Sequence, residues 1–179
     1  MTNLRLRITG CLAVTSALLS IPLVVLELTT PAQEWRLGRD LAGLVTTGLF
    51  VYLYVTLREL LNGRFGFHDV DGAIGFLVGG DVVLFLLGLL HRPSGEGREP
   101  VVDLAFVLLT AALGVGFVVF SRKLLGLGPR LSRPLRGFAY TNLVVGICLA
   151  SIVLLPIAIV ASVVADLVMG LVFFDARGR

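Results

Sequence analysis

Long apolar runs with few or no charged residues alternate with short charged segments in this chain, and they limit its fold more than any other feature. An α-helix needs about 20 apolar residues to cross the hydrocarbon core of a bilayer. Helices are favoured there because they satisfy their backbone polar groups internally. Of the 179 residues, 56% are hydrophobic and 15% are charged, whereas soluble domains carry about 25% charged residues. The sequence therefore predicts an all-α integral membrane protein.

The apolar runs predict a bundle of five transmembrane helices in one transmembrane domain, residues 1–179. We place the helices at residues 8–28, 40–61, 72–90, 102–125 and 138–156. The last apolar run covers 37 residues, 138–174. As one helix it would be about 55 Å long, against a hydrocarbon core of about 30 Å. Residues 157–174 are therefore expected to form a separate segment, and a sixth short or re-entrant membrane segment stays open.

Segment 157–174 carries almost only apolar side chains. If the segment continued straight out of the bilayer, it would expose these side chains to water. This exposure would cost about 25 cal/mol of free energy per Å² of apolar surface. A helix lying along the interface would normally carry Lys or Arg on its polar face, and this segment has neither. We therefore expect a second polypeptide, either a partner protein or another copy of the chain, to cover it.

An internal repeat relates residues 31–61 to residues 93–125. Both segments contain Pro-x-x-Glu-x-Arg, Asp-Leu-Ala, a threonine and Arg-x-Leu-Leu in the same order, and a partial third copy covers residues 156–174. Three aspartates recur at a spacing of 63 residues: Asp40, Asp103 and Asp166. A fixed period indicates tandem structural units. We therefore expect parallel helical hairpins related by an axis along the membrane normal.

Asp81 lies in the middle of the third predicted helix and is the most costly residue of the chain to place in a membrane. No lysine or arginine lies at its depth, so we expect its carboxyl to be uncharged at neutral pH. A neutral acid can bond to Thr110, Ser151 or a backbone carbonyl and hold helices together. Alternatively, Asp81 is a site for protons or cations, and Asp166 raises the same question. Both interpretations stay open.

Glycines give one side of the third predicted helix a smooth surface. Gly72, Gly75 and Gly79 follow one another at i, i+3 and i+7. Small residues at this spacing let a neighbouring helix approach closely. We therefore expect them to form a helix-packing face.

Five basic residues without an intervening acid follow the fourth predicted helix: Arg122, Lys123, Arg130, Arg133 and Arg136. Membrane proteins keep such loops on the cytoplasmic side, where they attract anionic lipid headgroups or an acidic partner. Of the 15 Lys and Arg, nine lie inside and six outside in a five-helix arrangement with an inner N-terminus, or eleven and four if the C-terminus also turns inside. Both counts predict a cytoplasmic N-terminus. We expect the protein to lie in a prokaryotic inner membrane.

No motif of catalysis or cofactor binding is present. No spacing matches a phosphate-binding loop, a zinc-binding helix or a nucleophile elbow. His68, Asp69 and Asp71 lie together in one loop, but a single short cluster is a weak metal signal, and Asp71 is more simply the cap of the third helix. A nucleic-acid partner would need a basic soluble face, which the apolar sequence does not offer. We predict no enzyme, no cofactor and no metal.

Two classes of function remain. The preferred one is a non-catalytic subunit or scaffold that packs against partner transmembrane helices in a larger complex, or forms a homo-oligomer through residues 157–174. The alternative is a small oligomeric transporter or channel for protons or cations that uses Asp81 at mid-membrane. A water-accessible cavity with Asp81 on its wall would favour the alternative, whereas Asp81 packed against another helix would favour the scaffold.

Overall fold

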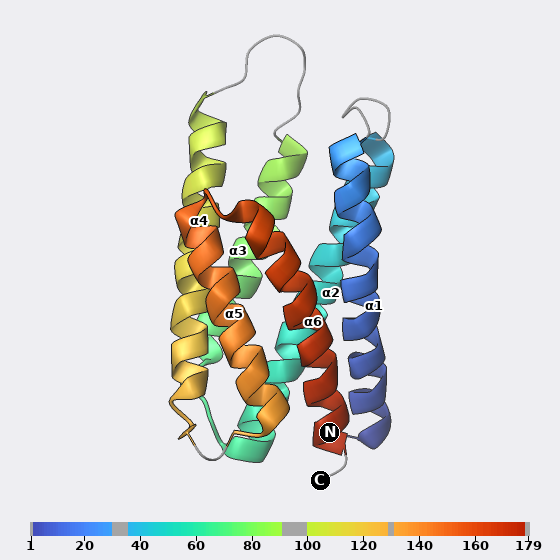
Figure 1. Ribbon diagram of the computed structural model, residues 1–179, viewed down its shortest axis with the longest axis vertical. Coiled ribbons are helices and arrows are strands. Elements are labelled where there is room, and N and C mark those ends of the chain that lie inside the picture. The colour runs from blue at the N-terminus through green and yellow to red at the C-terminus, as the bar shows by residue number, and fades with distance from the viewer. Residues whose placement is uncertain (1, 30–35, 91–99, 129–130, 178–179) are drawn as a thin grey trace.

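The computed structural model describes residues 2–29, 36–90, 100–128 and 131–177. In these ranges the chain forms six α-helices and no β-strand, which confirms the all-α class (Figure 1). The helices are α1 (Asn3–Thr29), α2 (Arg36–Phe65), α3 (Asp71–Leu90), α4 (Pro100–Leu125), α5 (Arg133–Ser151) and α6 (Leu155–Arg177). Five helices of the described chain, all except α5, are long and apolar enough to cross a membrane.

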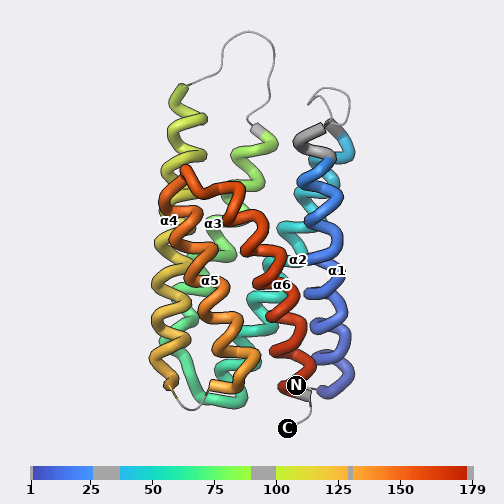
Figure 2. The backbone as a smooth tube through the Cα atoms, viewed as in Figure 1, coloured from blue at the N-terminus to red at the C-terminus, as the bar shows by residue number. Residues whose placement is uncertain are grey.

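The six helices close into a ring. Each helix packs beside the next one in the chain, and α6 also packs against α1. Figure 2 shows α6 between α5 and α1, and Figure 1 shows the start of α1 and the end of α6 at the same end of the bundle. We call this end the termini end. The opposite end, towards which α5 and α6 are joined, is called the turn end.

Large apolar side chains fill the termini half of the ring. They are at most 1% exposed, and we call them the apolar plug: Leu57, Leu61, Phe120, Leu124, Leu135, Phe138, Met169 and Phe173. Aromatic rings from different helices meet in it, since the ring centroids of Phe120 and Phe138 are 6.2 Å apart. Offset or edge-on contacts at such distances add to the stability that burial provides.

The predicted fifth helix, residues 138–156, is wrong in its position. Instead α5 runs over Arg133–Ser151, the chain reverses within residues 152–154, and α6 starts at Leu155. The residues of this reversal are apolar and do not indicate a turn. Ile152 nevertheless adopts a positive φ of 59°, which β-branched residues rarely do. Pro156 is the second residue of α6, a position that tolerates its missing amide hydrogen.

Part of the surface for which we expected a second polypeptide, residues 157–174, is therefore covered by the chain itself, and a partner there stays a prediction. These residues belong to α6, which runs back along α5 and packs between α5 and α1. Its inner face is buried by the chain itself, with Ala165 at 5% and Met169 and Phe173 at 0% exposure. Only its outer face remains exposed, through residues such as Val160 and Leu171.

Close helix packing uses other glycines than the predicted ones. A Cβ atom on Gly146 in α5 would lie 2.7 Å from the carbonyl oxygen of Gly114 in α4, so only glycine permits this approach. The α1–α6 contact relies on Gly10, where an added Cβ would lie 2.9 Å from the Phe174 ring.

The predicted glycine face of α3 packs against nothing within the described chain. No atom lies within 4 Å of a Cβ built on Gly72, Gly75 or Gly79. The helix instead turns Gly80 towards α4, where a Cβ would meet the Leu113 side chain. Spacing alone identified a smooth face, but it could not show which side of α3 faces the ring.

The repeated aspartates occupy different places along their helices. Asp40 is the fifth residue of α2 and Asp103 the fourth of α4, whereas Asp166 is the twelfth of α6. Asp40 and Asp103 therefore lie inside their helices, which begin four and two residues earlier than predicted. Duplication stays a prediction, and the third copy shows no positional equivalence at its aspartate.

Candidate functional site: a central polar cavity

A cavity of about 190 Å³ lies inside the ring, and every helix contributes to its wall. Its lining residues are Ser16 and Ser20 of α1, Thr46, Thr47, Phe50, Leu53 and Tyr54 of α2, Asp81 of α3, Phe117 of α4, Asn142 and Val145 of α5, and Ser162, Ala165 and Asp166 of α6. We call it the central cavity. Asp81 therefore lies on a cavity wall, where it also contacts Thr47 of α2.

Two carboxylates face this cavity from opposite positions in the ring. Asp81 belongs to α3 and Asp166 to α6, and three helix positions separate these two helices in either direction around the ring. Both carboxylates act electrostatically on the hydroxyl group of Tyr54, which is buried at 3% exposure. The two acids that the sequence places far apart thus share one site.

Each carboxylate is held by a hydroxyl group of the adjoining helix. The Thr47 hydroxyl of α2 is the hydrogen-bond partner of Asp81, whose second oxygen, Oδ2, is buried without a hydrogen-bond partner among the described residues. Ser16 of α1 donates to Oδ2 of Asp166 at 2.9 Å. Buried acceptors normally find a partner, so a proton, a water molecule or a ligand would satisfy this oxygen of Asp81.

The predicted partners of Asp81 are wrong. Thr110 donates to the carbonyl oxygen of Phe106 at 2.8 Å, and Ser151 donates to that of Cys148 at 2.9 Å. Both hydroxyls are therefore bonded within their own helices. Depth along the helices alone does not show that Thr47 of α2 lies beside Asp81.

The remaining hydroxyl groups of the cavity also donate their hydrogens to acceptors within the protein. Ser20 donates to Ser16 O at 2.9 Å, Thr46 to Ala42 O at 3.0 Å, and Ser162 to Ile159 O at 2.7 Å. Tyr54 donates across the ring to Oδ1 of Asn142 at 2.9 Å. A hydroxyl that donates its one hydrogen still offers oxygen lone pairs. The cavity therefore presents mainly acceptors, and no Lys, Arg or His lines it.

Aromatic rings form the floor of the cavity. Phe50 and Tyr54 of α2 have centroids 4.3 Å apart, and each lies 6.3 Å from the ring of Phe117 in α4. Beyond them, towards the termini end, Phe120 and Phe138 of the apolar plug contact Tyr54 at 6.0 and 6.4 Å. The plug thus separates the central cavity from the termini end.

A second cavity, of about 310 Å³, adjoins the central cavity towards the turn end. The two share Ser20, Thr46 and Ser162, and we call the second one the outer cavity. Its other lining residues are Leu23, Val24, Arg39, Ala42, Gly43 and Ile159. Arg39 is exposed and lies in the first turns of α2. The outer cavity therefore lies between an exposed arginine and the central cavity.

A third cavity, of about 280 Å³, lies at the termini end between α2, α5 and α6. Arg64, Ser132 and Asp175 are among the residues that line it. It shares no lining residue with the central cavity. Since it contains neither mid-helix carboxylate, we do not assign the central chemistry to it.

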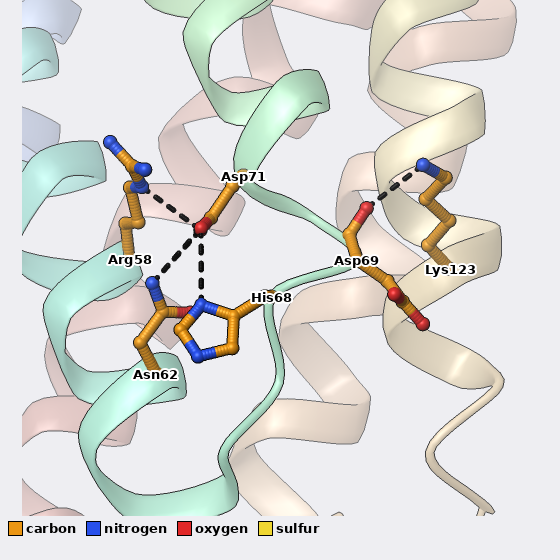
Figure 3. Close-up of polar contacts among 6 residues, drawn as sticks. All are labelled: Arg58, Asn62, His68, Asp69, Asp71 and Lys123. Carbon is orange, nitrogen blue, oxygen red and sulfur yellow. Dashed lines mark hydrogen bonds and ion pairs between the residues drawn. The ribbon is translucent and has the colours of Figure 1, made fainter.

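The loop that contains His68, Asp69 and Asp71 connects neighbouring helices through hydrogen bonds (Figure 3). The Asp71 carboxylate accepts hydrogen bonds from Arg58 Nε at 2.9 Å and Asn62 Nδ2 at 3.0 Å, and it lies 3.3 Å from His68 Nδ1. Lys123 donates to the backbone oxygen of Asp69 at 2.8 Å. These contacts join α2, α3 and α4. No group of three His, Cys, Asp or Glu side chains suited to a metal occurs in the described chain.

The basic residues after α4 lie at the termini end. Arg122 and Arg133 are exposed, Lys123 is held by the contact with Asp69, and Arg136 donates to Gly128 O at 3.3 Å. Arg130, the fifth member of this predicted lipid- or partner-binding group, is outside the described residues.

Sequence reasoning identified Asp81 but missed the site around it. Asp166 was assigned to a segment of unknown depth, and Thr47 and Ser16 were not considered. A signal was present in α6, since Ser162, Asp166, Met169 and Phe173 follow a spacing of four, three and four residues and so share one helix face. Two buried members of that face would have implied that Asp166 points inward.

The chain matches no protein-family model, and no curated protein and no solved structure is significantly similar to it.

Proposed function

We propose that this chain is an integral membrane protein that binds a monovalent cation or a proton in the central cavity and transports it through the bundle. The observation that carries the proposal is that Asp81 and Asp166 line one cavity at mid-helix depth. Ionisable residues inside membrane helices are costly, and they commonly mark ion or proton pathways.

The composition of the cavity favours a cation over an anion or a neutral molecule. Two carboxylates without a lining Lys, Arg or His form an uncompensated acidic pair. Such a pair is unfavourable in a low-dielectric interior unless a positive charge or a proton joins it. The unsatisfied oxygen of Asp81 and the hydroxyl lone pairs supply further acceptors for that cation.

The closure of one end favours transport over simple binding. The outer cavity adjoins the central cavity from the turn end and shares three lining residues with it, whereas the apolar plug fills the termini half. Transporters expose a central site to one side at a time. The described conformation corresponds to a state that is closed at the termini end, and a second state would have to open the plug.

The orientation proposed for this protein places both termini in the cytoplasm of a prokaryote. Only four of the 15 Lys and Arg, namely Arg36, Arg39, Arg92 and Arg98, fall in the sequence between mid-α1 and mid-α2 or between mid-α3 and mid-α4, and eleven fall on the other side. The positive-inside rule assigns the side with eleven to the cytoplasm. Tandem duplication of helical hairpins would explain the ring, with α1–α2, α3–α4 and α5–α6 as its three units.

Flux measurements on purified protein in liposomes test this function. We expect vesicles with a trapped pH-sensitive dye to take up protons, under a potassium diffusion potential, at least tenfold faster with the protein than without it. Asp81→Asn and Asp166→Asn should each lower this flux by at least tenfold, because each removes one of the two ionisable groups. A parallel assay with radioactive sodium covers a metal-cation substrate.

Asp40→Asn is the matched control, since Asp40 is an exposed carboxylate of α2 outside the cavity. Its flux should equal that of the wild type. The proposal is wrong if the wild type transports neither protons nor any monovalent cation, inorganic or organic, above empty vesicles, or if the double variant of Asp81 and Asp166 transports normally.

A second candidate function is the scaffold or complex subunit, and the open glycine face of α3 favours it. Gly72, Gly75 and Gly79 have no neighbour in the described chain, so a helix of a partner or of another copy has room to pack there. In this role the basic residues at the termini end would bind anionic headgroups or an acidic partner surface. Transport and oligomerisation are compatible, because the glycine face lies outside the ring.

A further inference from the structure

From the lining of the two connected cavities we infer that the transported cation is an organic ammonium ion, with alkyl or methyl groups on its nitrogen. This inference rests on the proposed function and names its substrate class. Three features of the site carry it: the acceptors around the carboxylates, the aromatic floor beneath them, and the apolar part of the outer wall.

The first feature is the distribution of acceptors. Asp81 and Asp166 supply negative charge from opposite sides of the ring, and the hydroxyl oxygens line the same cavity. The hydroxyl hydrogens are bonded to protein acceptors, so few donors remain for an anion. An ammonium group satisfies such a site, because it brings positive charge together with N–H or polarised C–H groups.

The second feature is the aromatic floor. Phe50, Tyr54 and Phe117 line the same cavity as the two carboxylates, and their centroids lie 4.3 to 6.3 Å apart. Aromatic rings attract cations within about 6 Å of their centroids, and grouped rings recognise alkylated ammonium ions. A bare metal ion would instead need a closed cage of oxygen atoms to replace its hydration shell. A floor of ring carbons supplies none.

The third feature is size and polarity. The central cavity, at about 190 Å³, is far larger than one dehydrated ion and accommodates a small organic molecule. The adjoining outer cavity is lined by Leu23, Val24 and Ile159 as well as by hydroxyl groups. A ligand with a charged head and a short apolar part would fit both cavities, with its head at the carboxylates.

Titration calorimetry on the purified chain in mild detergent tests the inference, with choline and tetramethylammonium as probes. Sodium chloride at matched ionic strength is the comparison. We expect both ammonium ions to bind at least tenfold more tightly than sodium. Asp166→Asn should weaken choline binding by at least tenfold, and Phe117→Leu by about tenfold, because leucine keeps an apolar side chain but removes the π face.

Two further variants make the test specific. Phe106→Leu removes an exposed phenylalanine of α4 outside both cavities and should leave binding unchanged. Phe50→Leu repeats the aromatic test at a partly buried position, in case the nearly buried Phe117 cannot be replaced without unfolding.

The outcomes separate the inference from the proposed function. Proton or sodium flux in liposomes, combined with choline binding no tighter than that of sodium, would overturn the ammonium inference and leave cation transport standing. Choline binding that is unaffected by both phenylalanine variants would also overturn it. Absence of both flux and binding would overturn the two proposals together.

Discussion

The termini half and the turn half of the bundle are built from the same helices but differ in what they enclose. In the termini half the ring is filled by the apolar plug, whose side chains are at most 1% exposed. In the turn half the ring encloses the central and outer cavities, with two carboxylates and several hydroxyl groups. One half is therefore densely packed, and the other contains the candidate site.

The change occurs along single helix faces. In α3, Ile74 and Leu77 are at most 1% exposed, and Asp81 continues their face one turn further towards the turn end. In α6 the order is reversed, because Asp166 precedes the buried Met169 and Phe173. Antiparallel helices thus bring their polar portions to the same level. The cost of the buried polar site is offset by a densely packed region a few turns away.

The largest expected effect comes from a substitution that creates a cavity in the apolar plug. Phe138→Ala removes a ring that is 0% exposed and contacts both Tyr54 and Phe120. We expect it to lower the free energy of unfolding by about 3–5 kcal/mol, the usual cost of truncating a buried phenylalanine. The measurement is denaturant-induced unfolding in mild detergent, followed by circular dichroism.

The matched variant in the turn half is Ser162→Ala. Ser162 is exposed and bonds only to the backbone of its own helix, so we expect a change within about 0.5 kcal/mol. Equal destabilisation by the two variants would contradict the assignment of stability to the termini half.

Two glycine substitutions test which helix contacts the fold depends on. Gly146→Ala should destabilise the protein by about 1–3 kcal/mol, because its Cβ would lie 2.7 Å from Gly114 O and force α4 and α5 apart. Gly75→Ala has open space around its Cβ and should be neutral, or stabilising by up to about 1 kcal/mol through helix propensity.

The same pair also tests the scaffold candidate. If Gly75→Ala leaves unfolding unchanged but reduces the assembly size in mild detergent, a partner helix packs on the glycine face of α3. An unchanged assembly would count against that face as an interface. Gel filtration with light scattering distinguishes the two results.

The all-helical class could be predicted from the sequence, because long apolar runs permit few alternatives. Asp81 was identified for a similar reason, since an acid at mid-helix is unusual whichever helices surround it. Predictions about helix partners failed. Thr110 and Ser151 were paired with Asp81 on depth alone, and Thr47 was overlooked because the order of helices around a ring is not encoded in any one segment.

The α5–α6 turn was missed for a local reason. Residues 152–154 lack the Gly, Asn or Asp that usually marks a reversal. Ile152 makes the turn in spite of its branched side chain, and its amide donates to Leu149 O at 3.2 Å. Because this turn was not predicted, residues 157–174 were not recognised as part of a long helix, and Asp166 was not placed in the same site as Asp81. One missed turn therefore left one of the two carboxylates out of the predicted site.

The smallest expected effect concerns Arg39, a positively charged residue that lines the outer cavity in the turn half. Arg39 lies eight residues before Thr47 on α2, which corresponds to about 12 Å along the helix axis. At that separation in water, its repulsion of a cation bound beside Asp81 changes the affinity by roughly twofold. Arg39→Gln should therefore strengthen choline binding about twofold at low salt, and the gain should disappear at high salt, where the Debye length is about 3 Å. Calorimetry at two ionic strengths measures it, with Arg122→Gln at the termini end as the matched control, which should show no change at either salt. Weaker binding in Arg39→Gln would mean that Arg39 holds the ligand, and the outer cavity would then have to be reassigned to a zwitterion.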